Sequence, residues 1–338
     1  MREIIKLDKI NVLVVEDLSP MRDLLVHMLR AIGIENVSFA SDGKSGFQSF
    51  CSKKPDIVIT DWHMPEMDGI ELIKKIRQSE ESPNRSVPVL MMSGFCSLKR
   101  ISAARDRGVT EFLVKPFSAK DLSLRIAYMI KNPRDFIVTH FFSGPDRRRK
   151  KNDDFDGTSK RQPASKDLLE SIPADKSLQV KVGIGRISDH AVARGQKILD
   201  ENTINFIPIA EEFIKKLEEA LRKSRTQEQS HNITMIELTA PIMQIKANAK
   251  IFHQELVGDL AAIILNFMES LASFDKNALD IIEAHIKTLQ QILKGNINDT
   301  NSQTGQTFKA ELKSACNRYK KLRAAQLQHK MRQELEKT

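Results

Sequence analysis

Cysteine is scarce in this sequence. The three cysteines, Cys51, Cys96 and Cys316, are far apart and odd in number. They lack the spacing of metal ligands, and a disulfide framework would need an even set. We therefore expect reduced thiols in a cytoplasmic protein.

Long apolar runs and targeting signals are absent as well. No stretch of about 18 apolar residues occurs, so we expect no membrane insertion. Residues 1–9 mix charges without a long apolar core, so we expect no signal peptide. The formal net charge of +9 favours anionic partners as a class, but it selects neither nucleic acid, membrane surface nor acidic protein.

Composition divides the 338 residues into three parts. Residues 9–131 alternate short apolar, β-branched runs with amphipathic stretches. Residues 144–166 are polar and highly charged, and they place a charged linker at 132–187. Residues 188–338 have helical spacing and few strand signals, which predicts an α-helical output or interaction domain.

Five short apolar runs in the first part predict strands that are buried on both faces of a parallel sheet. The runs are Asn11–Val15, Val37–Ala40, Asp56–Thr60, Val87–Met92 and Glu111–Val114. Helical stripes lie between them, for example after Ser19-Pro20 and after Gly69. Five strands that alternate with five helices predict a doubly wound α/β domain.

A polar residue follows almost every one of these runs. They are Glu16 and Asp17 after the first run, Asp61 after the third, Ser93 after the fourth and Lys115 after the fifth. Ligands of such sheets bind outside the carboxyl ends of the strands. We therefore expect three carboxylates, a hydroxyl and an ammonium to converge at one edge.

This set of groups suits phosphoryl transfer. Clustered carboxylates repel one another unless a cation lies among them, and oxygen ligands suit Mg²⁺. The Asp61 carboxylate can attack phosphorus to form an acyl phosphate. Mg²⁺ and Lys115 would neutralise the phosphoryl oxygens, and Ser93 would hydrogen-bond one of them.

Four segments in order, VLVVED, DWHMPEMDG, LMMSG and FLVKPF, resemble the receiver domains of bacterial two-component response regulators. They are most similar to single-domain chemotaxis regulators, over residues 9–131. The resemblance implies a flavodoxin-like five-stranded sheet of order 2-1-3-4-5. It also implies phosphorelay signalling, with a histidine kinase or histidine phosphotransfer protein as phosphodonor.

The resemblance implies a role for each matching position. Asp61 is the phosphoacceptor, and it ligates Mg²⁺ together with Asp17 and the backbone carbonyl of His63. Glu16 acts through a metal-bound water.

The remaining positions surround the phosphoryl group. Ser93 and Lys115 contact it, and Phe112 occupies the position of an aromatic switch residue. The Lys115–Pro116 peptide is expected to be cis.

Plainer interpretations of these residues remain open. Asp17 alone could cap the helix that starts near Ser19, and Asp61 alone could lie in a turn. A receiver that folds without being phosphorylated is a third possibility. The cap and turn interpretations do not explain why a lysine and three carboxylates all follow strands, and a receiver that has lost phosphorylation would be expected to lack a residue of the acidic site.

Three apolar stripes and a more polar fourth pattern predict a bundle of helices in the last part. The stripes are Phe206–Leu221, Leu256–Leu271 and Leu279–Leu293, and the polar pattern covers residues 306–335. Residues 230–293 resemble histidine phosphotransfer bundles in layout. Aligned on Gln244-Ile245-Lys246, Met243 stands where the phosphotransfer histidine belongs, and Ala247 stands where glycine belongs. The resemblance thus implies a bundle that has lost this chemistry and that can still dock or dimerise.

The sequence favours a phosphoacceptor signalling protein over an ordinary enzyme. Residues 134–338 contain no glycine-rich phosphate loop, acidic metal cluster or nucleophile elbow. We expect output through a downstream protein partner or a homodimer. The alternative is a phosphorylation-controlled, DNA-binding transcription regulator, which the positive charge suggests; no helix-turn-helix pattern follows the first domain closely.

Overall fold

The structure of the protein is a computed structural model, and it describes residues 3–94, 104–146, 168–226 and 230–335. The chain forms two compact units, Met1–Asn202 and Thr203–Thr338. The first unit is built on a parallel sheet, and the described part of the second unit is entirely helical.

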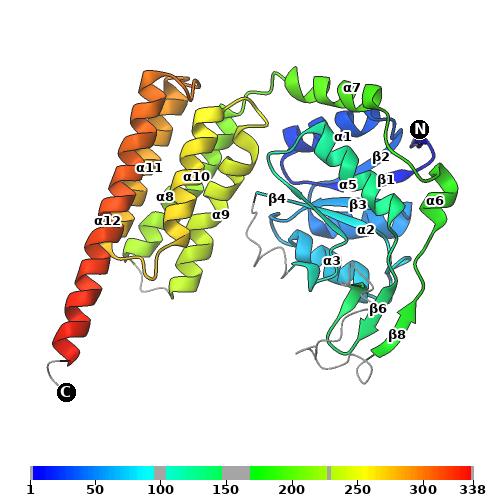
Figure 1. Ribbon diagram of the computed structural model, residues 1–338, viewed down its shortest axis with the longest axis horizontal. Coiled ribbons are helices and arrows are strands. Elements are labelled where there is room, and N and C mark those ends of the chain that lie inside the picture. The colour runs from blue at the N-terminus through cyan, green and yellow to red at the C-terminus, as the bar shows by residue number, and fades with distance from the viewer. Residues whose placement is uncertain (1–2, 95–103, 147–167, 227–229, 336–338) are drawn as a thin grey trace. The chain divides into compact units, whose positions relative to one another are not determined.

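A five-stranded parallel sheet lies at the centre of the first unit, in the predicted order β2-β1-β3-β4-β5 (Figure 1). The strands are β1 (Asn11–Val15), β2 (Asn36–Ala40), β3 (Ile57–Asp61), β4 (Val89–Ser93) and β5 (Glu111–Val114). All residues of β3 and β4 are buried, because helices cover both faces of the sheet. This double burial is why the sequence shows continuous apolar runs rather than alternation.

Helices α1 (Ser19–Ala31) and α5 (Ala119–Lys131) cover one face of the sheet, and α2 (Gly43–Lys53) and α3 (Gly69–Gln78) cover the other (Figure 1). Their starts are locally encoded. Pro20 lies in the first turn of α1, and the side chains of Asp42, Asp68 and Ser118 cap α2, α3 and α5. The stretch left for the fifth predicted helix includes residues 95–103, which lie outside the described residues, as does Cys96.

The first unit continues well beyond the predicted domain end at residue 131. A small antiparallel sheet of order β7-β6-β8 consists of β6 (Phe136–Thr139), β7 (Ser143–Pro145) and β8 (Leu168–Ile172). Helices α6 (Ser177–Val182) and α7 (Asp189–Asp200) follow, and α7 packs against α1 and α5. The predicted linker at 132–187 therefore contains regular elements. Its charged centre, residues 147–167, lies outside the described residues.

A buried arginine explains why the chain folds back after α5. Arg77, at the end of α3, donates to the carbonyl oxygens of Gly108 (3.1 and 3.0 Å) and Val87 (2.8 Å). The hydroxyl of Ser143 in β7 donates to the carbonyl of Arg77 at 3.0 Å. The Arg77 guanidinium also lies over the ring of Phe136, 5.7 Å from its centre. The apolar run Phe136–Thr139 thus packs on the first domain. The run is too short to indicate this contact from the sequence.

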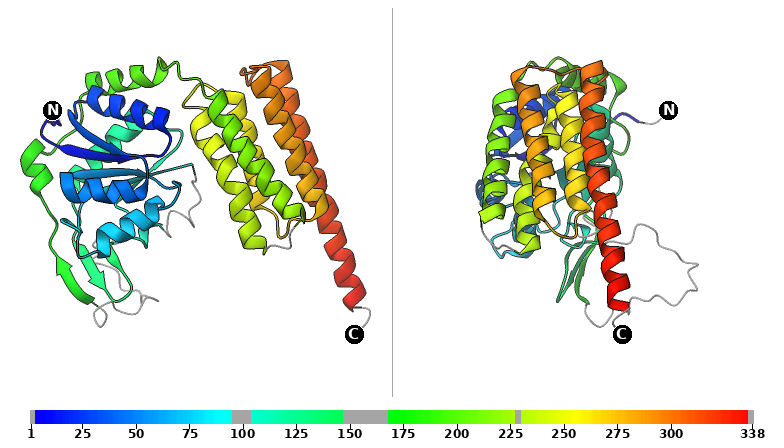
Figure 2. Two further views of the ribbon diagram at one scale, coloured as in Figure 1. Left: turned by 180° about the vertical axis from the view of Figure 1, so that it is seen from behind. Right: turned by 90° about the vertical axis from the view of Figure 1, so that its left-hand side faces the viewer.

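The second unit is a bundle of long helices (Figure 2). They are α8 (Ile207–Thr226), α9 (His231–Ala249), α10 (Glu255–Glu269), α11 (Lys276–Lys294) and α12 (Gln303–Leu335). Helix α8 packs on α9 and α11, whereas α10 packs on α9, α11 and α12. The three predicted stripes coincide with α8, α10 and α11, and α12 extends past the ends of its neighbours (Figure 2).

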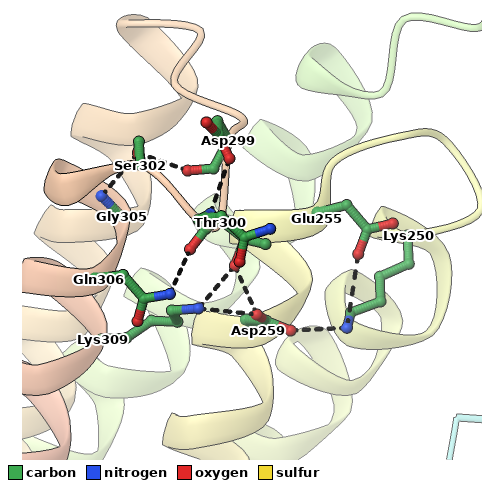
Figure 3. A network of polar contacts seen from close by, with 10 residues as sticks. Lys250, Glu255, Asp259, Asp299, Thr300, Ser302, Gly305, Gln306 and Lys309 are labelled. Carbon is green, nitrogen blue, oxygen red and sulfur yellow. Dashed lines mark hydrogen bonds and ion pairs between the residues drawn. The ribbon is translucent and has the colours of Figure 1, made fainter.

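A polar network joins the turns of this bundle (Figure 3). Asp259 of α10 forms an ion pair with Lys250 at 2.7 Å, and its other oxygen accepts from the Thr300 hydroxyl at 2.8 Å. Lys309 of α12 donates to the same hydroxyl at 2.9 Å. Burial raises the pKa of Asp259, but the hydrogen bonds from Lys250 and Thr300 outweigh it and hold the pKa below its ordinary value. The network fixes the turn before α12 onto α10.

The structure gives no support to a phosphotransfer role for this bundle. Met243, at the position where the resemblance requires an accessible histidine, is buried inside α9. Within the described ranges, no helix is long and apolar enough to cross a membrane.

Candidate functional site

Three carboxylates meet at the carboxyl ends of two neighbouring strands. Glu16 and Asp17 come directly after β1, and Asp61 is the last residue of β3. The two strands pair in parallel, with Val15 beside Thr60. One carboxylate oxygen from each of the three residues lies within 4.8 Å of the other two. The convergence predicted from the strand ends is therefore present in the fold.

The lysine that follows β5 reaches into this acidic cluster. The Nζ atom of Lys115 lies 2.8 Å from Glu16 Oε2 and 3.2 Å from Asp61 Oδ1. Its backbone N–H donates to the carbonyl of Ser93, the last residue of β4, at 2.7 Å. The Lys115–Pro116 peptide is cis, as expected. The ends of four strands thus supply Glu16, Asp61, Ser93 and Lys115, and all four side chains are buried.

Burial and an excess of negative charge govern the electrostatics of this site. Burial raises the pKa of Glu16 to about 8; Lys115 opposes the shift, and Asp61 adds to it. Burial lowers the pKa of Lys115, but the charges of Asp61 and Glu16 outweigh it, so that the pKa lies above its ordinary value. Glu16 thus holds its proton mainly because it is buried, whereas Lys115 holds its proton because negative carboxylates surround it.

This imbalance fits a divalent cation. Among the residues that the structure describes, the Oε1 atom of Glu16 is buried and has no hydrogen-bond partner. An unsatisfied buried carboxylate oxygen is costly, and a cation would satisfy it. The donor set is made of oxygen atoms on Glu16, Asp17 and Asp61, which is the ligand chemistry that Mg²⁺ prefers.

Gly69, which in the sequence marks only the start of a helical stripe, shapes the loop after β3. A Cβ atom built on Gly69 would lie 2.1 Å from the carbonyl oxygen of Asp61, which no side chain tolerates. The Gly69 N–H donates to the carbonyl of Trp62 at 2.9 Å. Close approach of α3 to the acidic strand end therefore requires glycine. The Asp68-Gly69 pair, a helix cap followed by a small residue, was the available signal.

The aromatic residues that follow Asp61 pack against one another and against Phe112. Phe112 is buried in the core cluster that also includes Met64, and its ring centre lies 6.0 Å from that of Trp62. The ring of His63 stacks on Trp62 at 5.9 Å. Phe112 is thus held by the residues that follow Asp61, which is a suitable place for a side chain that responds to changes there.

Comparison with known proteins identifies the first unit. The family description "Response regulator receiver domain" matches residues 12–127. The chemotaxis protein CheY-3 of Vibrio cholerae is 37% identical over 116 residues, which cover 34% of this chain and 88% of that protein. The chemotaxis protein CheY of Pseudomonas aeruginosa is 35% identical over 116 residues and is covered to 92%. The chain belongs to the response regulator receiver family. The receiver is a phosphoacceptor domain of two-component phosphorelay signalling. Such domains bind Mg²⁺ at an acidic site, and this chain has an acidic cluster of Glu16, Asp17 and Asp61.

These matches lie in the receiver. A solved structure of Vibrio cholerae chemotaxis protein CheY4 is 29% identical and covers 35% of this chain and 95% of that chain, with a TM-score of 0.32. The receiver match ends at residue 127, before β6. The second sheet, α6, α7 and the helical unit are therefore additions to the matched domain.

Proposed function

We propose that Asp61 is the phosphoacceptor of this receiver. The single observation that carries the assignment is the position of Lys115, whose ammonium lies 3.2 Å from Asp61 and 2.8 Å from Glu16. A buried lysine aimed at a strand-end carboxylate neutralises charge where a phosphoryl group would attach to that carboxylate.

The proposed phosphodonor is a phosphohistidine of a histidine kinase or histidine phosphotransfer protein. An oxygen of the Asp61 carboxylate attacks phosphorus, and an O–P bond forms as the P–N bond to the donor imidazole breaks. The ring nitrogen that carried phosphorus keeps the electron pair of the broken bond, and the ring leaves as neutral imidazole because its other nitrogen carries a proton. The product on this chain is an aspartyl phosphate.

The other residues bind and orient. Glu16, Asp17, Asp61 and the backbone carbonyl of His63 would hold Mg²⁺, with Glu16 acting through a metal-bound water. When bound, Mg²⁺ supplies neutralising charge to the phosphoryl oxygens. Ser93 and Lys115 bind phosphoryl oxygens, and Phe112 is the proposed switch residue.

We assign the output to protein contacts of the helical unit. It has its own buried core, formed for example by Leu260, Ile264 and Ile286. Helix α9 leaves two large apolar side chains exposed one turn apart, Ile233 at 49% and Ile236 at 66%. Apolar side chains grouped on one helix face favour contact with another protein.

The test uses beryllofluoride, a phosphoryl mimic that binds a carboxylate oxygen. Trp62, the only tryptophan of the chain, follows Asp61 directly, so its fluorescence reports binding. We expect a saturable change with the wild type only when Mg²⁺ is present, and none with Asp61→Asn. Asp23→Asn, an exposed carboxylate on α1, is the matched control and should bind as the wild type does. Undiminished binding by Asp61→Asn would overturn the assignment.

A further inference from the structure

Helix α7 docks closely onto the receiver although it lies outside the matched domain. It packs against α1 and α5, and Figure 1 shows it beside them. A Cβ atom built on Gly195 would lie 2.9 Å from Ile32 and 3.3 Å from Ala119, so a glycine is needed at this contact. Arg194 also donates to the carbonyl of Ala31, at the end of α1, at 3.1 Å.

One polar contact of α7 reaches the loop that carries the site lysine. The side-chain oxygen of Gln196 accepts the backbone N–H of Ala119, the first residue of α5, at 2.9 Å. The side-chain nitrogen of Gln196 donates to Asp200 at 2.8 Å, which sets the orientation of the amide. First-turn N–H groups have no partner within their own helix, so this bond satisfies a group that the receiver alone leaves open.

The connection from this contact to the acidic cluster is short and tightly held. Only Pro116, Phe117 and Ser118 separate Lys115 from Ala119. Phe117 is buried, and Ser118 caps α5 through a reciprocal pair of bonds with Asp121. The three intervening residues therefore cannot absorb a shift of the start of α5, and such a shift moves Lys115.

We propose that Gln196 is a positioning residue for phosphoryl binding, because it holds the start of α5 and thereby the Lys115 ammonium in place. The inference rests on the proposed function of Asp61. Without Gln196, binding of the phosphoryl group must itself order the loop between Lys115 and Ala119. The free energy spent on that ordering lowers the affinity of the site for the phosphoryl group.

Coupling between two sites is reciprocal. If docked α7 favours phosphoryl binding, then the phosphoryl group favours docked α7 by the same factor. Helix α7 ends at Asp200, and the second compact unit begins at Thr203. The phosphorylation state thus acts directly on the segment that leads into the helical unit.

The experiment compares three variants of the full chain with the wild type at saturating Mg²⁺. Gln196→Met removes the acceptor and keeps the size and helix propensity of the side chain. Gln196→Glu combined with Asp200→Asn restores an acceptor for Ala119 and a donor from position 200. Lys197→Met changes an exposed neighbour on α7, whose side chain is 69% accessible.

Beryllofluoride affinity, read from Trp62 fluorescence, should fall about threefold to tenfold in Gln196→Met, the worth of one part-buried hydrogen bond. It should recover in the paired variant and stay unchanged in Lys197→Met. In the wild type, beryllofluoride should slow hydrogen exchange of the α7 amides by a similar factor, and this protection should vanish in Gln196→Met. A merely structural role would not link exchange in α7 to the mimic.

The outcomes separate the two proposals. If the wild type binds beryllofluoride and Gln196→Met binds it equally well, the role of Gln196 is refuted while the Asp61 assignment stands. The same holds if the mimic leaves exchange in α7 unchanged. If the wild type fails to bind the mimic, the Asp61 assignment falls, and this inference falls with it.

Discussion

At the scale of single residues, the site is defined by where strands end. Glu16, Asp61, Ser93 and Lys115 could all be predicted because each ends or directly follows an apolar run, and parallel strands bring those positions to one edge. Gln196 could not be predicted. It lies 77 residues from Ala119, and nothing local in either segment indicates that they meet.

The ammonium of Lys115 should have opposite effects on the two ligands of the site. In Lys115→Met, the carboxylates lose the ammonium that the described part of the chain places beside them, so Mg²⁺ should bind more tightly. Beryllofluoride should bind about tenfold or more weakly, since a charged hydrogen bond to it is lost. Titration of Mg²⁺ and then of the mimic, followed by Trp62 fluorescence, measures both affinities.

Lys120→Met, which removes an exposed lysine on α5, is the control and should change neither affinity by more than about twofold, as a screened surface charge. Weaker Mg²⁺ binding by Lys115→Met would show that the lysine supports the cation rather than competes with it.

At the scale of elements, the strands were predictable and some of their additions were not. The predicted runs Asn11–Val15 and Glu111–Val114 coincide with β1 and β5 residue for residue. Strand β6 was not predicted, because a four-residue run beside a highly charged stretch is a weak strand signal. Its contact with the buried Arg77, through Phe136, is not visible in the sequence. Helix α9 gave no stripe because it is buried on several sides and contains Pro241.

Helices α11 and α12 are joined by a buried pair of titratable side chains. The Nδ1 atom of His285 lies 2.8 Å from the carbonyl of Ile281, and a carbonyl only accepts, so Nδ1 carries the proton. The other nitrogen, Nε2, is then the acceptor for the thiol of Cys316 at 3.8 Å. Burial raises the pKa of Cys316 to about 11, which keeps the thiol protonated.

This pair predicts how the stability of the helical unit depends on pH. Burial lowers the pKa of His285, so the unfolded chain takes up a proton near pH 6.5 that the folded one refuses. Stability should therefore fall as the pH drops below about 6.5, by at most about 1.4 kcal/mol per pH unit for this one proton.

Hydrogen exchange of the α11 amides at pH 5.5 and 7.5, corrected for intrinsic rates, measures the effect as an opening free energy. In His285→Gln, the opening free energies at pH 5.5 and pH 7.5 should differ by less than they do in the wild type. An equal difference in both proteins would place the pH dependence elsewhere.

At the scale of the whole molecule, the chain combines a receiver with a helical unit that has a separate core. The division into an α/β part and an all-α part was evident from the change of periodicity along the sequence. The extent of the first unit was not, because α7 belongs to it through contacts with α1 and α5 rather than through its own composition. Along the chain, α7 is the last helix before the helices that we propose as output.

The central claim is that Asp61 carries the phosphoryl group. The most direct measurement exposes the full chain to a small acyl phosphate donor, such as acetyl phosphate, with and without Mg²⁺. The modified residue is then mapped by mass spectrometry of peptides kept at neutral pH. We predict one Mg²⁺-dependent, acid-labile phosphoryl group on the peptide that contains Asp61, and none in Asp61→Asn. A phosphoryl group on a different residue, or equal labelling of Asp61→Asn, would contradict the account.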